Sequence, residues 1–160
     1  MDSLIARDRE TMMEIGLEIG RQLRPGDVLS LVADLGGGKT TLTKGIVSGY
    51  LGIEQDEVTS PAFALVQEYE GSGNNVVYHI DWYRLEAISD HDHLMFEEYF
   101  EDKSAVIIVE WGDKGVRDFT NDFLKIEIDF VDTVSSEARL LKIEKFGNSS
   151  TLSNLDRFRR

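Results

Sequence analysis

The spacing of apolar residues divides the chain into helical and extended segments. In residues 9–23 apolar side chains recur every three or four positions, as in an amphipathic helix, and residues 88–101 show the same periodicity. Residues 123–131 alternate between apolar and polar side chains, as half-buried strands do, and residues 138–146 alternate less regularly. A continuous apolar run from Ala105 predicts a buried central strand. Helical and extended segments interleave, which favours an α/β fold.

Residues 62–80 predict a β-hairpin. An alternating segment is followed by Gly-Ser-Gly-Asn-Asn from Gly71, which is a strong turn signal, and residues 76–80 form the return strand. A hairpin at this point is unusual in a plain doubly wound sheet. Further along, the segments 123–131 and 138–146 are expected to pair as antiparallel strands at one side of the sheet.

A glycine-rich segment follows the first predicted strand. Apolar residues in 28–32 lead into Asp-Leu-Gly-Gly-Gly-Lys-Thr-Thr, and Leu42, Ile46 and Tyr50 then form a helical stripe. The segment matches the phosphate-binding loop G-x-x-x-x-G-K-[ST], except that Ala33 stands at the first glycine position. We therefore expect six residues of the loop to bind nucleotide phosphates: Gly36, Gly37, Gly38, Lys39, Thr40 and Thr41.

The residue types of this loop suit a triphosphate. Glycines let several backbone N–H groups reach the phosphate oxygens, and they permit positive φ angles. The loop ends at a predicted helix N-terminus, where unpaired N–H groups and the helix dipole favour an anion. We expect Lys39 to place its charge on the terminal phosphates and Thr40 to offer its hydroxyl to Mg²⁺.

Two carboxylates stand at the ends of predicted strands. Asp81 follows the return strand of the hairpin, and Glu110 follows the apolar run from Ala105. A Mg²⁺-bound nucleotide needs a metal ligand and a group that orients the attacking water, and acids at strand ends can fill both roles. Either acid could instead form a structural ion pair, for example Asp81 with Arg84. These residues by themselves indicate an NTPase or an NTP-dependent transferase.

The choice of nucleotide rests on elimination. The sequence has no N-K-x-D run, which usually gives GTPase specificity. Its arginines are scattered and form no arginine-rich lid of the kind that covers the phosphates in small-molecule kinases. ATP is therefore the favoured substrate.

Composition adds limits on partners and compartment. The 160 residues carry a formal net charge of −13, which argues against direct binding to a nucleic-acid backbone and leaves room for a basic protein partner. The chain has no cysteine, so disulfides and thiol catalysis are excluded. It shows no signal peptide and no apolar run of membrane length, so we expect a cytoplasmic protein. We expect residues 1–146 to form a single P-loop ATPase domain and residues 147–160 a polar, mobile tail.

Four motifs together resemble one known family. The runs A-D-L-G-G-G-K-T-T-L-T-K-G, S-P-A-F-A-L-V-Q-E-Y, V-V-Y-H-I-D-W-Y-R-L and V-I-I-V-E-W resemble the TsaE (YjeE) family, bacterial ATPases of tRNA threonylcarbamoyladenosine (t6A) biosynthesis. The resemblance covers residues 10–145. It implies a P-loop NTPase-like mixed sheet flanked by helices, with a β-hairpin after the P-loop helix and antiparallel strands at the C-terminal side. It also implies Mg²⁺-dependent ATP hydrolysis, slow without partners, in a complex with TsaD and TsaB that makes the only contact with tRNA.

The resemblance implies roles for single residues. Glu110 would be the second metal-linked acid beside Thr40, and Asp81 would direct the water or the phosphate. Together with Lys39 these two acids are the expected catalytic residues. Trp111 matches the family's tryptophan after the acid and is a candidate auxiliary residue.

The chain departs from the family pattern at several positions. The family usually reads G-D-L-G-A-G-K-T-T, where this chain has Ala33 and Gly37, and S-P-T-F-T-L, where this chain has Ala62 and Ala64. Thr11 is out of register with the family's threonine before the first helical glycine. If the family's threonine hydroxyls, which Ala62 and Ala64 lack, order the segment over the γ-phosphate, then ATP turnover is slower here or more dependent on partners. Two other functions therefore stay open: a nucleotide-gated binding module with little turnover, and a small-molecule kinase.

Overall fold

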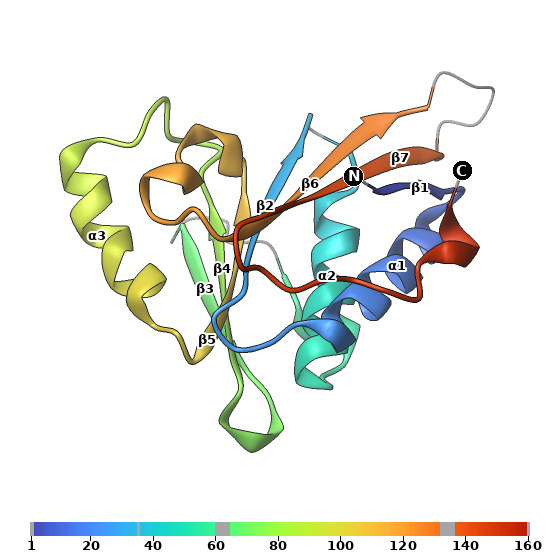
Figure 1. The fold of residues 1–160 in the computed structure, drawn as a ribbon, viewed down its shortest axis with the longest axis horizontal. Helices are drawn as coiled ribbons and strands as arrows, with labels where there is room; N and C mark the ends of the chain where they lie inside the picture. Colours follow the sequence, from blue (N-terminus) through green and yellow to red (C-terminus); the bar gives the residue numbers. More distant parts are fainter. Residues whose placement is uncertain (1, 35, 60–64, 132–136, 160) are drawn as a thin grey trace.

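One mixed sheet forms the centre of the molecule. The computed structural model describes residues 2–34, 36–59, 65–131 and 137–159. Within these residues seven strands form the sheet, and α-helices cover both of its faces (Figure 1). The α/β architecture predicted from the apolar pattern is therefore confirmed.

The sheet is parallel at its centre and antiparallel at both sides. Its strands are β1 (Asp2–Ala6), β2 (Val28–Ala33), β3 (Val66–Glu70), β4 (Val76–Asp81), β5 (Ala105–Glu110), β6 (Phe123–Phe130) and β7 (Arg139–Phe146). They lie in the order β1-β7-β6-β2-β5-β4-β3. β2 pairs in parallel with β5 and β6, and β4 pairs in parallel with β5. The predicted hairpin (β3 and β4) and the predicted C-terminal antiparallel pair (β6 and β7) are both confirmed.

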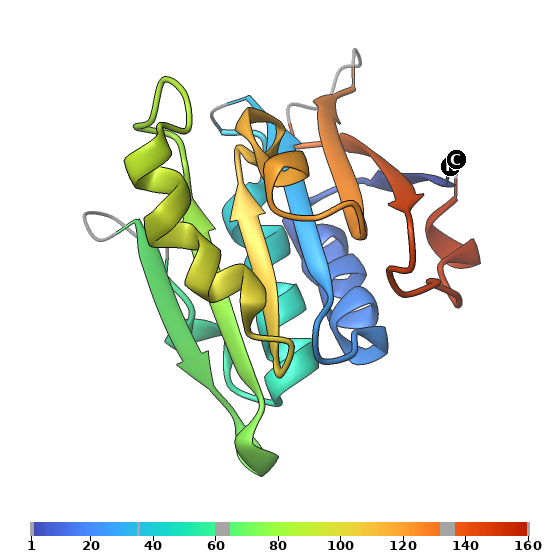
Figure 2. The same cartoon turned by 60° about the vertical axis from the view of Figure 1, so that its left-hand side comes forward.

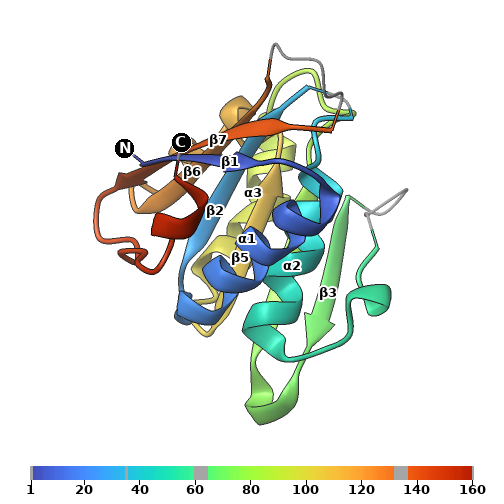
Figure 3. The same ribbon diagram turned by 90° about the vertical axis from the view of Figure 1, so that its right-hand side faces the viewer.

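Two helices share one face of the sheet, and the third covers the other. α1 (Arg9–Gln22) and α2 (Lys39–Leu51) lie side by side, and α3 (Asp90–Glu101) lies across the sheet from them (Figures 2 and 3). The helices predicted at 9–23 and 88–101 are thus confirmed. Among the described residues, no helix is long and apolar enough to cross a membrane.

Each face of the sheet has its own hydrophobic core. Under α1 and α2, Leu31 and Ile108 from the sheet pack with Ile46. Under α3, the fully buried Trp82 packs against Phe96, with ring centroids 5.5 Å apart. Alternation along the strands sends neighbouring residues to opposite faces, so the sheet is buried on both sides.

Glycines allow α1 and α2 to pack at close range. A Cβ added to Gly45 would lie 2.5 Å from the backbone oxygen of Met13, and one added to Gly49 would lie 2.4 Å from that of Leu17. On the facing helix, a Cβ on Gly16 would lie 2.6 Å from the Leu42 oxygen. The three glycines therefore let the two helix backbones approach more closely than residues with a Cβ would allow.

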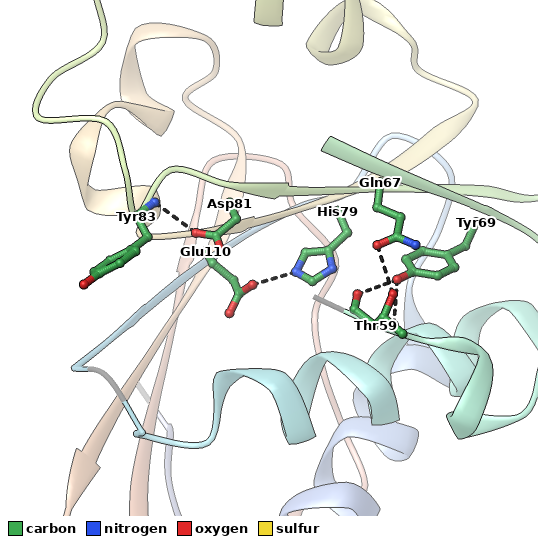
Figure 4. Close-up of polar contacts among 7 residues, drawn as sticks. All are labelled: Thr59, Gln67, Tyr69, His79, Asp81, Tyr83 and Glu110. Atoms are coloured by element: carbon green, nitrogen blue, oxygen red, sulfur yellow. Dashed lines mark hydrogen bonds and ion pairs between the residues drawn. The ribbon is translucent and has the colours of Figure 1, made fainter. Parts of the chain in front are cut away.

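The hairpin is joined to the loop that precedes it. The hydroxyl of Tyr69 in β3 donates to the carbonyl oxygen of Thr59 at 2.6 Å and accepts from the Thr59 N–H at 2.9 Å (Figure 4). The hairpin was predicted to begin at residue 62, and its first described strand begins at Val66. Ala62 and Ala64 lie outside the described residues.

The first strand was missed in the sequence. β1 pairs with β7 in antiparallel fashion at the edge of the sheet, and it buries Leu4 and Ala6. The strand has five residues and its apolar positions Leu4, Ile5 and Ala6 are consecutive, so the sequence offers no alternation from which to predict it.

The segment after β7 lies against the domain. Leu155 and Phe158 are buried in the core on the α1 side, and Leu4 forms an isolated antiparallel bridge with Arg159. The two ends of the chain consequently lie close together (Figure 1). This packing differs from the polar tail that we expected at 147–160, because the two apolar side chains give the segment something to bury. The division of the chain at residue 146 stays a prediction.

The Gly45→Ala variant tests the helix contact. Its methyl group would meet the Met13 oxygen and force α1 and α2 apart, so we expect the free energy of unfolding to fall by about 1–3 kcal/mol. Lys44→Ala, one residue earlier on the same helix, is the control and should change it by less than about 0.5 kcal/mol. Chemical denaturation measures both; equal stability of the two variants would contradict the close contact.

Candidate functional site

The carboxyl ends of β2, β4 and β5 meet the N-terminus of α2 at one edge of the sheet. A cavity of about 400 Å³ lies there. Its lining includes every site residue predicted from the sequence: Gly36, Gly37, Gly38, Lys39, Thr40, Thr41, Asp81, Glu110 and Trp111. Arg9 and Tyr83 also line the cavity, and neither was predicted to do so from the sequence. Ligands of open α/β sheets commonly bind at this edge.

The glycine loop (residues 34–38) connects β2 to α2. Gly36 and Gly38 have φ angles of 76° and 100°, a region that residues with a Cβ rarely adopt. Gly38 is the N-cap of α2 and supplies no side chain to cap it. No side chain thus caps the first turn of α2, and a helix N-terminus of this kind favours an anion through its N–H groups and its dipole.

Lys39 is buried at the mouth of this loop. Its ammonium group donates to the carbonyl oxygens of Ala33 at 2.9 Å and Asp34 at 3.1 Å, and it lies 4.3 Å from the centroid of the Trp111 ring. Burial lowers the pKa of Lys39, and the negative charges of Glu110 and Asp81 oppose that shift. The side chain thus points into the cavity as a partly desolvated cation, which strengthens its attraction for an anion.

Two carboxylates face Lys39 from neighbouring strands. Asp81 and Glu110 are direct partners in the parallel register of β4 and β5. Asp81 accepts a hydrogen bond from the Tyr83 N–H at 2.9 Å (Figure 4). Burial raises the pKa of Asp81, and the charge of Glu110 raises it further. The structure thus brings both strand-end acids and the loop lysine to one cavity.

A buried histidine supports Glu110. Nε2 of His79 lies 2.8 Å from Oε2 of Glu110, and both residues are almost fully buried (Figure 4). Sequence reasoning missed this pair. A signal was present, because His79 and Asp81 are two residues apart on one strand and therefore point to the same face.

Aromatic side chains form one wall of the cavity. The rings of Tyr83 and Trp111 lie 5.4 Å apart, between centroids. Trp111 has a φ of 62°, which is uncommon for a residue with a Cβ. Lys114 donates to the carbonyl oxygens of Trp82 and Tyr83 at 2.9 and 3.0 Å, which joins the segments that follow β4 and β5. This contact holds the aromatic wall in place.

The oxygen donors of the cavity fit a magnesium ion. The hydroxyl of Thr40 and the carboxylates of Asp81 and Glu110 line the same space, and Mg²⁺ prefers oxygen ligands. Thr11 lies at the start of α1, where its N–H donates to the capping Asp8 at 2.7 Å, and it is absent from the described lining. A role for Thr11 at the site gains no support.

The family follows from comparison with known proteins. The model of the family described as threonylcarbamoyl adenosine biosynthesis protein TsaE matches residues 6–139. The chain belongs to the TsaE family. The predicted resemblance is therefore confirmed, and the chain is one of the proteins of t6A biosynthesis.

Individual TsaE relatives match over most of their length. The tRNA threonylcarbamoyladenosine biosynthesis protein TsaE of Streptomyces coelicolor is 35% identical over 85% of this chain and 91% of its own. That of Rickettsia felis is 31% identical over 96% of this chain and 84% of its own. The crystal structure of Bacillus subtilis YdiB has a TM-score of 0.71 at 32% identity, covering 91% of this chain and 86% of that one. This likeness confirms the P-loop NTPase-like fold.

Two departures from the TsaE loop pattern compensate for each other in space. The family's usual pattern has glycine where this chain has Ala33, and alanine where it has Gly37. A Cβ added to Gly37 would lie 3.0 Å from the Ala33 Cβ and 2.9 Å from the Asp34 oxygen. The Ala33 methyl group therefore occupies part of the space that a methyl group on residue 37 would need, and the Asp34 oxygen limits that space further.

Exchanging the two residues tests this compensation. Gly37→Ala alone should crowd the loop and lower the melting temperature, because its Cβ meets Ala33. Adding Ala33→Gly should recover at least half of the loss, although Ala33→Gly alone should also destabilise β2 by about 0.5–1 kcal/mol. Thermal unfolding of all four proteins measures the coupling. Strictly additive effects would show that the two positions are independent.

The buried Asp81 predicts a stability that depends on pH. Its pKa is raised above the ordinary 3.8 in the folded state, so ionising it costs stability at neutral pH. That cost disappears as the pH falls through the raised pKa and is absent below the ordinary value. Asp81→Asn can still accept from the Tyr83 N–H, so it should raise the melting temperature near pH 7 and leave it unchanged near pH 3.

Thermal unfolding between these pH values checks the prediction for Asp81. Exposed Asp56→Asn is the matched control for loss of a carboxylate away from the cavity. An Asp81→Asn variant that is less stable than the parent at neutral pH would contradict it.

Proposed function

We propose that this TsaE-family chain binds and hydrolyses ATP with Mg²⁺ in the cavity between the glycine loop and the ends of β4 and β5. The observation that carries the proposal is the convergence of Lys39, Asp81 and Glu110 on one space at the N-terminus of α2. Phosphoryl transfer requires a cation, acidic groups and N–H donors, and here the N–H donors are those at the N-terminus of α2.

Each residue has a role that follows from its position. The N–H groups of the glycine loop and of the first turn of α2 bind phosphate oxygens, and Lys39 exchanges its two carbonyl partners for the terminal phosphates. Thr40 and Glu110 would hold a magnesium ion, which would supply positive charge to neutralise the phosphates. Asp81, on the strand next to Glu110, accepts a hydrogen bond from the attacking water and orients it.

A second cavity provides space for the nucleoside. It measures about 230 Å³ and shares Arg9, Gly36, Gly38 and Thr41 with the first. The side chains of Met12 and Arg139 also line it. An apolar thioether and a planar guanidinium suit the faces of a nucleobase. This adjoining space favours a nucleotide over a free phosphate chain as the ligand.

The hydrolysis serves t6A formation in a complex with TsaD and TsaB. The net charge of −13 disfavours direct capture of tRNA, so tRNA is reached through the partners. In this role, in the cytoplasm, ATP turnover resets the complex that transfers the threonylcarbamoyl group to adenosine. The alternative is a nucleotide-gated binding module with little turnover. It is favoured by the contacts of the Lys39 ammonium group with two loop carbonyl oxygens and the Trp111 ring, because these contacts compete with phosphate for the lysine.

Two variants separate binding from turnover. Lys39→Ala should weaken ATP binding at least 100-fold, because it removes the cation that faces the phosphates. Glu110→Ala should keep nucleotide affinity within about threefold and lower kcat by about 100-fold or more. Lys44→Ala on the same helix is the control and should match the parent. Calorimetry and phosphate release measure the two quantities, and unchanged hydrolysis in both site variants would contradict the proposal.

Phosphate release measured with and without TsaD and TsaB tests whether these two proteins are partners of this chain. Hydrolysis should be slow alone and rise when the pair is added. A single-turnover experiment distinguishes the alternative: a binding module would show nucleotide-dependent association with the pair but no burst of phosphate. Failure of the pair to bind or to stimulate would contradict the assigned role while leaving ATP binding intact.

A further inference from the structure

The His79–Glu110 pair is buried at the cavity, and the mechanism above uses Glu110 but gives His79 no role. His79 is 1% exposed and Glu110 is 3% exposed. Glu110 lines the cavity, whereas His79 does not. Its hydrogen bond to Glu110 is therefore the direct contact through which His79 reaches the cavity.

The register of the two strands fixes how the pair meets. His79 lies opposite Ile108, and Asp81 lies opposite Glu110. The histidine is therefore two residues further from the carboxyl ends of the strands than the two acids are. Figure 4 shows the His79 ring reaching Glu110 from the neighbouring strand, with Nε2 2.8 Å from Oε2. An ionised carboxylate only accepts hydrogen bonds, so the contact requires a proton on Nε2 wherever Glu110 is ionised.

The other ring nitrogen argues against a purely structural histidine. Nδ1 of His79 is buried and has no hydrogen-bond partner among the described residues. Burying an unpaired polar atom costs stability, and an apolar side chain would avoid that cost at the same place. The benefit of a histidine here is therefore the single Nε2–H bond to Glu110.

We propose that His79 is a positioning residue for Glu110. Its Nε2–H holds one carboxylate oxygen and leaves the other directed at the cavity, where Glu110 serves the magnesium ion. Partners of metal-binding carboxylates commonly act in this way. The inference rests on the proposed function, because it assumes that Glu110 contributes to metal binding.

Two substitutions of His79 test the role. His79→Phe keeps a ring without a donor, and His79→Gln keeps an N–H donor without a ring. With a non-hydrolysable ATP analogue bound, Mn²⁺ affinity measured by electron paramagnetic resonance should fall about 10–100-fold in His79→Phe. His79→Gln should recover most of that loss. Metal-free affinity for the analogue should stay within about twofold in both, because the glycine loop and Lys39 are untouched.

Controls separate positioning from general stability. Val77→Ala removes buried volume two residues earlier on the same face of β4, so it should lower the melting temperature without changing Mn²⁺ affinity. In a Glu110→Gln background, His79→Phe should add no further loss of Mn²⁺ affinity. Equal losses in His79→Phe and His79→Gln, or a further loss in the Glu110→Gln background, would overturn the proposal.

A measurement that leaves His79 and Glu110 unchanged does not depend on how the His79 variants fold. The sequence has three histidines, so ¹⁵N-labelled His79 can be assigned with His91 and His93 substituted. Nitrogen shifts should show a proton on Nε2, and a proton on Nδ1 alone would overturn the proposal. If the parent binds neither ATP analogue nor Mn²⁺, the proposed function fails, whereas normal binding by the parent and by His79→Phe refutes the positioning role alone.

Discussion

The parallel pairing of β4 with β5 is the constraint on which the candidate site depends. This pairing puts Asp81 opposite Glu110 and brings both carboxylates to the edge of the sheet where β2 delivers the glycine loop. A shift of β4 by one residue would turn Asp81 away from Glu110 to the face covered by α3, where aromatic rings form the core. The apolar residues that alternate along β4 and fill β5 prevent that shift, so the same side chains that form the core also set the geometry of the site.

The packing of α1 against α2 supplies the other half of the arrangement. Because Gly16 and Gly45 bring the two helix backbones together, α1 lies close enough for Arg9 to reach the cavity beside Lys39. The same approach places Met12 next to the loop, where a Cβ on Gly38 would lie 3.1 Å from its methyl group. The glycine loop is thus supported by α1, and α1 lies close enough to do so because Gly16 and Gly45 have no side chains.

Sequence reasoning found the features whose signals are local. The glycine loop, its lysine and the strand-end acids have characteristic residue types at short spacing, and the hairpin has an explicit turn at Gly71. Features that depend on distant pairing were missed. β1 becomes a strand only because β7 is beside it, and Phe158 is buried only because the chain returns to the sheet. His79 looked like an ordinary strand residue, since its partner lies on another strand. The Ala33 and Gly37 exchange required coordinates, because the motif shows their spacing in sequence and not the distance between them.

Burying the charged residues of the cavity lowers the stability of the folded state, and this cost supports their assignment to a functional site. A lysine, two carboxylates and a histidine share a partly desolvated region, and burial shifts the pKa of Lys39 and of Asp81 toward their neutral forms. Apolar residues would pack at these positions without such a penalty. Charged groups kept against this cost lie where a ligand of opposite and mixed charge compensates them, and a magnesium–triphosphate complex offers both signs at once. The balance of one cation against two anions matches the magnesium–nucleotide ligand that we propose, because Lys39 would pair with phosphate charge and Glu110 with the metal ion.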